Sequence, residues 1–283
     1  MVKSIKEALN FGFLKLKENN IDSALIDTYV LLCHILKCDK GYLTVHNNEP
    51  ISEVALSEFE NLIEKRAKKM PVKYLTGICE FYSLEFMVDK NVLIPRPDTE
   101  IIIDTALNEI DRNKDIKILD LCSGSGCIGI TLATLYKNSQ VTLVEVSDGA
   151  ISISQKNIIK HNLDDRIKIV KRDILSESLQ GTFDLIVSNP PYINEDDYKK
   201  LDEDVKNYEP ELALVSHGDE YKFYKRIIDS FSKNLADNGI ILLEIGYNQS
   251  EYLSEYAFNS HIFSDISVVK DLSGINRVLC LKK

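Results

Sequence analysis

Apolar side chains in the first 75 residues recur every three or four positions, the spacing that one face of an α-helix requires. Such stretches begin just after Ser4, after Asp22-Ser23 and after Ser52, and residues of these types commonly cap helix N-termini. Ser4 also has Glu7 three positions later, the combination known as a capping box. We therefore expect a small N-terminal helical bundle, and we find no catalytic signature within it.

The period of the apolar pattern then falls to two. Leu84, Phe86 and Val88 alternate with more polar residues, which is typical of a strand with one buried face. The turn-forming residues 89–91 come next, and the apolar run 92–94 predicts a returning strand. The sequence thus predicts a β-hairpin that joins the bundle to the rest of the chain.

Residues 95–100 follow this hairpin and contain two prolines around Arg96, which makes the segment stiff. The segment leads into a helix predicted over 101–110. It is either a plain linker or a means of placing Arg96 and Thr99 near a ligand.

From residue 117 onward, short apolar strands alternate with helical patterns. This alternation predicts an α/β fold with a doubly wound, mostly parallel sheet. A helix is expected over 221–235, and Asp237-Asn238-Gly239 is expected to end it before the next strand. The last two strands should add to one edge of the sheet in antiparallel fashion. The strands are predicted over 117–121, 141–145, 167–170, 183–187, 240–245, 267–269 and 277–281.

The pentapeptide Ser188–Tyr192 follows a strand that is apolar enough to be buried on both faces. Its two prolines allow neither a helix nor a continued strand, so a rigid polar turn stands at the carboxyl end of that strand. Ligands bind at this edge of open α/β sheets. Asn189 and the Pro190 carbonyl offer acceptors beside the Tyr192 ring, a site for gripping a planar –NH2 group. An ordinary proline-rich turn is the alternative reading.

A second motif runs from a strand into the loop Cys122-Ser123-Gly124-Ser125-Gly126 and on into a helix. The glycines allow close approach to a ligand, and the helix N-terminus offers free N–H groups. The next strand ends in Glu145, nineteen residues beyond Gly126, the spacing at which a carboxylate grips a ribose diol. These six residues are candidate cofactor contacts.

This strand–loop–helix–strand motif is compatible with two nucleotide-containing cofactors, NAD and S-adenosylmethionine. NAD is disfavoured because the loop lacks the first glycine of its fingerprint and no phosphate-facing basic residue follows. S-adenosylmethionine, which has ribose and adenine but no pyrophosphate, fits better. Asp173 follows the third strand and could accept from the adenine amino group, with Ile174 against the ring. The alternative is that Asp173 is only the N-cap of the next helix.

Composition narrows the class of protein. The N-terminus lacks a signal-peptide pattern and no apolar run is long enough to span a bilayer, so we expect a cytoplasmic protein without membrane contact. The six cysteines include no Cys-x-x-Cys and read as free thiols. Cys33, His34 and Cys38 lack a second ligand cluster nearby, so we expect no metal site.

The net charge of −10 is uneven along the chain. Residues 1–78 hold eleven basic and ten acidic residues, which leaves twenty-three and thirty-four for the remainder. An acidic catalytic half argues against a nucleic-acid partner, since such binding relies on clustered Lys and Arg. The one basic cluster, around 65–69, reads first as a solvated helix end and second as a partner surface.

Together these motifs resemble the peptide chain release factor glutamine N5-methyltransferases, over most of the chain. The segment 92–100 is the family's most particular signature, whereas Asn-Pro-Pro-Tyr is shared with adenine-N6 methyltransferases. The other matching segments are 74–77, 80–81, the Gly124 loop, 208–210, 244–246 and 271–274. The sequence departs from the family at Cys122, usually Gly, and at Glu145, usually Asp.

The resemblance implies a Rossmann-like class I methyltransferase fold with a seven-stranded sheet. It divides the chain into a helical release-factor-recognition domain (1–78), the hairpin linker (79–95) and a methyltransferase domain (96–283). It implies that S-adenosylmethionine is converted to S-adenosylhomocysteine, and that the substrate is the glutamine of the Gly-Gly-Gln motif in class I release factors. We expect a monomer.

The residues themselves suggest a mechanism in which no base is needed. Asn189 and the Pro190 carbonyl would each accept one amide N–H, Tyr192 would stack on the amide plane, and Pro191 would complete the substrate site. Three alternatives remain open: a ribosomal-protein glutamine methyltransferase, a DNA adenine-N6 methyltransferase, or a binding module that has lost turnover.

Overall fold

The computed structural model describes residues 3–283, which fall into two compact units. The first unit holds the N-terminal residues up to Ile78 together with Asp202–Tyr208, and the second holds Cys79–Leu201 and Glu209–Lys283. The chain therefore passes between the units three times. Each unit has a hydrophobic core of its own, and each is described separately here.

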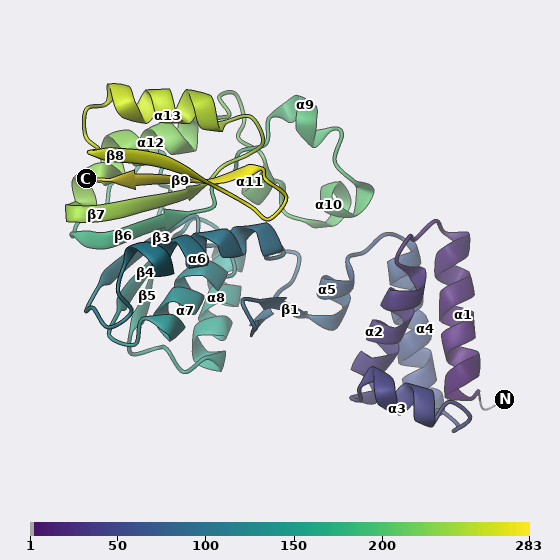
Figure 1. Ribbon diagram of the computed structural model, residues 1–283. Helices are drawn as coiled ribbons and strands as arrows, with labels where there is room; N and C mark the ends of the chain where they lie inside the picture. Colours follow the sequence, from purple (N-terminus) through teal and green to yellow (C-terminus); the bar gives the residue numbers. More distant parts are fainter. Residues whose placement is uncertain (1–2) are drawn as a thin grey trace. The chain divides into compact units, whose positions relative to one another are not determined.

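The first unit is built from helices, as the apolar spacing predicts (Figure 1). The side chain of Ser4 accepts from the Glu7 N–H, and the capping box is complete. Ser52 caps its helix in the same way. The inserted residue Tyr208 donates its hydroxyl to the Lys68 carbonyl at 2.6 Å. The helices are α1 (Ile5–Glu18), α2 (Ala24–Leu36), α3 (Lys40–Val45), α4 (Glu53–Ala67), α5 (Val72–Thr76) and the inserted α10 (Glu203–Tyr208).

A small two-stranded sheet follows, but its strands differ from those expected. It pairs β1 (Ile78–Phe81) with β2 (Leu84–Met87) through Tyr82 and Ser83, whose φ angles of 50° and 60° form the turn. The prediction that 92–94 returns as a strand is wrong. The Ile94 N–H instead donates to the carboxylate of Glu209, so this stretch is held by a side chain and not by a β-ladder.

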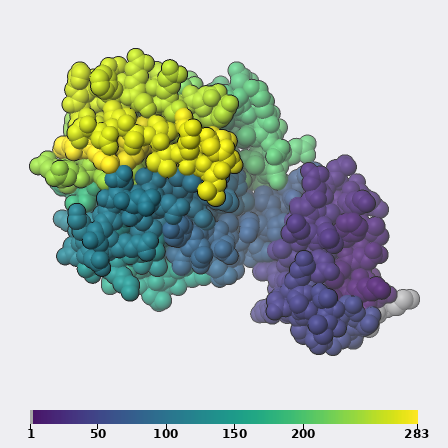
Figure 2. All heavy atoms as spheres, in the orientation of Figure 1, coloured from purple at the N-terminus to yellow at the C-terminus, as the bar shows by residue number. Residues whose placement is uncertain are grey.

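The main sheet has seven strands in the order β5-β4-β3-β6-β7-β9-β8. β9 pairs antiparallel with both β7 and β8 and all the other strand pairs of this sheet are parallel, which confirms the mostly parallel sheet and the antiparallel addition at one edge. Figure 2 shows the C-terminal segment, in yellow, gathered on one side of this unit. The strands are β3 (Lys117–Leu121), β4 (Gln140–Glu145), β5 (Ile167–Lys171), β6 (Phe183–Ser188), β7 (Leu235–Glu244), β8 (Asp265–Lys270) and β9 (Asn276–Lys282).

Helices cover both faces of the sheet, and each face has its own apolar core (Figure 1). One face packs against α6 (Glu100–Glu109), α7 (Cys127–Leu135) and α8 (Asp148–Lys160). The other packs against α12 (Lys222–Ser230) and α13 (Ser250–Asn259). Short elements complete the unit: η1 (Pro97–Thr99), α9 (Glu195–Tyr198), α11 (Glu211–Leu214) and η2 (Phe231–Asn234).

One expected helix end is wrong. Asp237-Asn238-Gly239 lies inside β7, where the pairing with β6 shifts register between Leu235 and Ile240. Asn238 has a φ of 61°, so the irregularity is absorbed as a bulge within the strand. The helix before it, α12, consequently ends earlier, at Ser230, and continues only as the 3-10 turn η2.

Candidate active site

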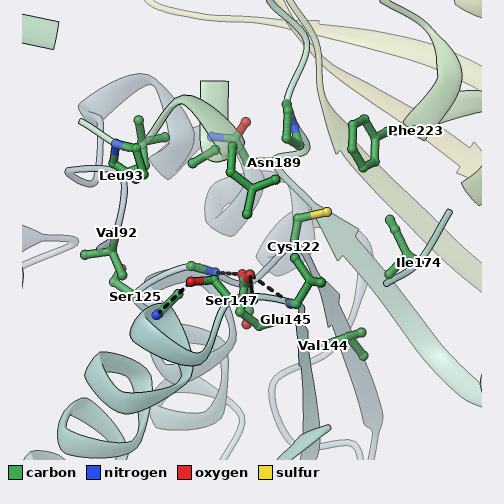
Figure 3. Close-up of a pocket in the computed structure, with 18 of the residues that line it drawn as sticks. Val92, Leu93, Cys122, Ser125, Val144, Glu145, Ser147, Ile174, Asn189 and Phe223 are labelled. Carbon is green, nitrogen blue, oxygen red and sulfur yellow. Dashed lines mark hydrogen bonds between the residues drawn. The ribbon is translucent and has the colours of Figure 1, made fainter. Parts of the chain in front are cut away.

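A cavity of about 310 Å³ lies where β3, β4, β5 and β6 end at their carboxyl edge. Strand order reverses beside β3, with β4 on one side and β6 on the other, and such switch points are where α/β sheets bind ligands. Figure 3 shows Val92 and Leu93 on one side of the cavity, Ile174 and Phe223 on the opposite side, and Cys122 and Glu145 between them.

The loop after β3 contributes Cys122, Ser123, Gly124 and Ser125 to the cavity wall. Its backbone is in the left-handed region at Cys122 and Gly124, with φ of 58° and 55°. Glycine adopts this conformation freely, whereas it costs a cysteine about 1 kcal/mol or more. Burial raises the pKa of the Cys122 thiol well above its ordinary value, so this side chain is a neutral part of the wall.

Gly126 does not line the cavity but is the N-cap residue of α7. Its φ is 80°, and a Cβ there would stand 3.0 Å from the Ile130 Cδ1 atom. The glycine therefore serves the close packing of helix on sheet at the end of the loop.

Glu145, at the end of β4, is the most firmly held polar side chain of the cavity. Its Oε2 atom accepts from the Gly124 N–H at 2.9 Å. Its Oε1 atom accepts from the N–H groups of Val146 and Ser147 at 2.9 and 3.0 Å. Three backbone donors on one carboxylate fix its position without a counter-ion, and they tie the loop after β3 to the loop after β4.

Asp173 lines the cavity beyond β5, although its carboxylate is already engaged. It accepts from the Leu175 N–H and from the Ser176 hydroxyl, both at 2.9 Å, in a turn and not at the N-terminus of a helix. The expected neighbour Ile174 also lines the cavity. Phe223 lies beside Ile174 in Figure 3, and sequence reasoning missed it because it read this residue only as part of α12.

Asn189 and Pro191 line the cavity at the end of β6. The Asn189 side-chain nitrogen donates to the Thr99 hydroxyl at 3.2 Å, which leaves the side-chain oxygen as the free acceptor. Pro190 is buried and is not part of the lining. Tyr192 also lies outside the lining, and its hydroxyl donates to the Glu244 carboxylate at 3.4 Å.

A further wall of the cavity comes from the segment 91–99, including Arg96 and Thr99. Glu209, buried to 6 % exposure, holds this segment in place. One of its carboxylate oxygens accepts from the Ile94 N–H at 3.1 Å, and the other pairs with the Arg96 guanidinium. Glu209 thus ties this segment to a part of the second unit that lies more than a hundred residues further along the chain.

Replacing Glu209 by alanine is expected to destabilise the second unit by about 2 kcal/mol. The change leaves the buried Ile94 N–H without an acceptor, which costs about 1–3 kcal/mol, while Arg96 can turn to solvent. Thermal unfolding should show the loss. Glu211→Ala is the matched control, since the side chain of this exposed residue is paired with His217 at the surface. An equal effect of both changes would contradict the assignment.

Asp120 lies in β3 below the cavity loop and is completely buried. Burial raises the pKa of its carboxyl to about 8, the Gly129 N–H partly offsets this rise, and nearby Glu145 adds to it. The group is therefore protonated at neutral pH in the folded chain, whereas an unfolded aspartate ionises near 3.9.

This pKa difference predicts a pH dependence of stability. Between about pH 4 and pH 8 the folded state binds the extra proton, so the free energy of unfolding falls as pH rises through that window. Asp120→Asn cannot ionise and should reduce this fall. The free energy of unfolding is measured for both chains at pH 5 and pH 8. Relative to the parent chain, the variant should be more stable at pH 8 than at pH 5. Parallel pH profiles would refute the prediction.

Within residues 3–283, no group of three or more His, Cys, Asp and Glu side chains is placed to hold a metal ion. Across the same residues, the structure contains no helix whose length and apolar character would let it cross a bilayer.

Comparison with known proteins adds independent findings. Residues 7–77 match the family model of the PrmC N-terminal domain, and residues 99–205 match that of the methyltransferase small domain. A release factor glutamine methyltransferase of Clostridium botulinum is 42% identical over 282 residues, covering 99% of each chain. One from Clostridium acetobutylicum is 40% identical over 277 residues, covering 97% of each. Among solved structures, a Pyrococcus furiosus methyltransferase aligns over 80% of this chain and 98% of its own, with a TM-score of 0.53 and 17% identity, which supports the fold.

Proposed function

This chain belongs to the release factor glutamine methyltransferase family, and from that premise we propose that it transfers a methyl group from S-adenosylmethionine to a glutamine side-chain amide. The acceptor is the glutamine of the Gly-Gly-Gln motif in class I peptide chain release factors. The observation that carries the proposal is the free Asn189 oxygen on the wall of a cavity that also presents the Glu145 carboxylate.

The cavity suits S-adenosylmethionine in three respects. The buried Ser123 hydroxyl finds no hydrogen-bond partner among the described residues, so it is free to serve a polar ligand. A Cβ at Gly124 would meet no atom within 4 Å, so the loop leaves room beside it. The walls are mainly apolar apart from a few placed polar groups, as small-molecule sites are.

Each part of the cofactor has candidate partners in this cavity. The Glu145 carboxylate accepts from a ribose hydroxyl through its Oε2 atom, where the Gly124 N–H leaves one lone pair available. Ile174 and Phe223 enclose the adenine ring, and Asp173 accepts from its amino group. The loop 122–125 holds the methionine portion. When bound, the cofactor supplies a methyl group on a sulfonium sulfur.

The turn after β6 orients the substrate. An amide nitrogen is a poor nucleophile because its lone pair is delocalised into the carbonyl. The Asn189 oxygen accepts one N–H of the glutamine amide from the cavity wall. The Pro190 carbonyl, which lies outside the cavity lining, accepts the other N–H, and together they turn the nitrogen lone pair toward the methyl group. The same acceptors stabilise the positive charge that develops on nitrogen. The proton leaves after transfer, when the nitrogen is acidic, so the site needs no dedicated base.

Tyr192 takes a modified role in this proposal. Its hydroxyl is bound to Glu244, so its ring is fixed at the base of the turn. Because this ring does not line the cavity, it stacks on the substrate amide from outside the cavity. The first unit supplies the surface that recognises the release factor.

The decisive experiment uses labelled S-adenosylmethionine and a full-length class I release factor, alongside a Gln→Ala variant of its Gly-Gly-Gln motif. Label on the parent factor alone would support the substrate, the residue and the reaction together. Label on both factors would refute the assigned glutamine. If neither factor takes up label, the same assay is run with ribosomal protein and with DNA, and label there would replace the proposed substrate by one of those alternatives.

A further inference from the structure

Gln249, the residue just before α13, carries a buried side-chain amide that the proposed chemistry does not use. It is 4 % exposed and does not line the cavity. Its main-chain carbonyl accepts from the Leu253 N–H in the first turn of α13. Leu253 is itself completely buried in the apolar core between this helix and the sheet. The position of Gln249 is therefore set by a well-packed helix.

The Gln249 amide is hydrogen-bonded at both of its ends. Its oxygen accepts from the Gly246 N–H at 2.9 Å. Its nitrogen donates to the Tyr192 main-chain carbonyl at 3.2 Å and to the Glu220 carboxylate at 3.4 Å. An amide turned by 180° would set its oxygen against these two acceptors and its nitrogen against the Gly246 N–H. Only one orientation of this side chain satisfies its neighbours.

Tyr192, the last residue of the turn after β6, is held on three sides by the segment 244–249. Its hydroxyl donates to the Glu244 carboxylate at 3.4 Å. The backbone at Gly246 passes close to its ring, since a Cβ there would stand 3.0 Å from the Tyr192 Cδ2 atom. Gln249 holds its main-chain carbonyl. Of these contacts, the one from Gln249 is the one that acts on the backbone of the turn.

The turn between β6 and Tyr192 transmits this constraint. Pro190 and Pro191 each have a fixed φ, so few backbone torsions between Asn189 and Tyr192 can change. At the other end, the buried Ser188 hydroxyl donates to the Leu121 carbonyl at 2.7 Å. The turn is thus a stiff link between two anchors. A displacement of Tyr192 also displaces the Pro190 carbonyl and the Asn189 side chain.

We propose that Gln249 is a positioning residue that acts through the Tyr192 main-chain carbonyl to fix the Asn189–Tyr192 turn in the geometry that methyl transfer requires. The inference rests on the proposed function, because it concerns the same transfer to an amide nitrogen. Gln249 lies outside the cavity lining. Its loss therefore acts on turnover and not on the affinity for S-adenosylmethionine.

Two variants of Gln249 remove the hold on Tyr192 in different ways. Q249E has nearly the same shape and can still accept from the Gly246 N–H, but it sets a carboxylate oxygen against the Tyr192 carbonyl. Q249M fills a similar volume and makes neither hydrogen bond. A loss shared by both variants therefore reports the missing donor and not a cavity or a charge.

N234D is the matched control, because it makes the same change from amide to carboxylate at a distant place. The Asn234 nitrogen donates to the main-chain carbonyls of Leu179 and Gly181. Asn234 directly precedes Leu235, which pairs with Phe183 at the start of β6. This residue thus lies at the amino edge of the sheet, whereas the cavity lies at the carboxyl edge.

The test measures kcat with the full chain and a release factor, and the Kd for S-adenosylmethionine by calorimetric titration. Q249E and Q249M should lower kcat by about 10-fold to 100-fold, as expected for misplaced reacting groups, with Kd changed less than about threefold. N234D should keep kcat within about twofold of the parent chain. Thermal unfolding is recorded for all three variants, so that turnover is compared at a temperature where each is folded.

Hydrogen exchange of the Ile193 amide provides a readout that needs no methyl acceptor. Its N–H donates to the Leu214 carbonyl at 3.0 Å, directly after Tyr192 in the chain. Exchange there should be several-fold faster in Q249E and Q249M than in the parent chain, and unchanged in N234D, because local opening frees this N–H.

The outcomes separate the inference from the proposed function. Unchanged kcat in Q249M, a loss of cofactor affinity as large as the loss of kcat, or an equal loss of kcat in N234D would each overturn the positioning role. Unchanged exchange at Ile193 in both Gln249 variants would show that Gln249 does not hold the turn. Failure of the parent chain to methylate any release factor would overturn the proposed function itself, before any variant is compared.

Discussion

Asn189→Ala is expected to lower turnover by about two to three orders of magnitude while S-adenosylmethionine binding stays within a few-fold of the parent value. The variant removes the Asn189 side-chain oxygen, the acceptor that this residue presents on the cavity wall at the end of β6. Losing one preorganised group aimed at developing charge typically costs about 100-fold to 1000-fold in kcat. Transfer of labelled methyl measures the first quantity, and calorimetric titration measures the second.

Asn194→Ala is the matched control for this change. Asn194 lies five residues further along the same connection, where its oxygen accepts from the N–H groups of Asp196 and Asp197 as the N-cap of α9. Loss of the cap costs about 1 kcal/mol of local stability and should leave turnover within twofold. Near-normal turnover in Asn189→Ala, or equal losses in both variants, would eliminate the proposed mechanism.

Glu145→Ala should weaken S-adenosylmethionine binding by about 100-fold or more. The change removes the acceptor assigned to the ribose, at about 1.5–3 kcal/mol per hydrogen bond to a charged group. It also leaves three backbone N–H groups without their carboxylate, those of Gly124, Val146 and Ser147. The loops after β3 and β4 then lose their common anchor, and saturating cofactor should restore only part of the turnover.

Glu145→Asp separates the two contributions, since it keeps the charge and shortens the side chain by one methylene. We expect its affinity to lie much closer to the parent chain than to Glu145→Ala. Asp148→Ala is the control for acidity near the site, because this side chain is 80 % exposed and pairs only with Lys171. Unaltered cofactor affinity in Glu145→Ala would exclude Glu145 from the ribose site.

The parts of the fold that sequence reasoning predicted correctly are those with a strong local cause. Runs such as 117–121 and 183–187 are mainly apolar, with the buried Asp120 as an exception, and only a strand buried on both faces accommodates so many apolar side chains in succession. The hairpin was misplaced because Tyr82 and Ser83 make its turn without the Asn-Gly signal such turns usually carry, whereas the residues at 89–91 resemble a turn strongly.

The residues of the candidate site also divide into those that local sequence predicts and those that it does not. The loop 122–125 and Asn189 directly follow strands and Glu145 ends one, so local sequence sufficed to place them at one edge of the sheet. Phe223 carries no local mark of function. It reaches the cavity wall beside residues that lie far away in the sequence, and tertiary packing alone brings them together.

The insertion of α10 into the first unit has a consequence for the order in which the chain is made. The first 78 residues leave the ribosome early, yet the unit they belong to also needs Asp202–Tyr208. That helix is synthesised only after β3, β4, β5 and β6 and the Asn189 turn. The N-terminal unit therefore reaches its final packing, including the Tyr208 hydrogen bond to Lys68, only when four of the five parallel-paired strands of the main sheet have already been synthesised. Because the chain is synthesised from its N-terminus, the first unit cannot finish folding until most of the second unit's parallel strands have been made.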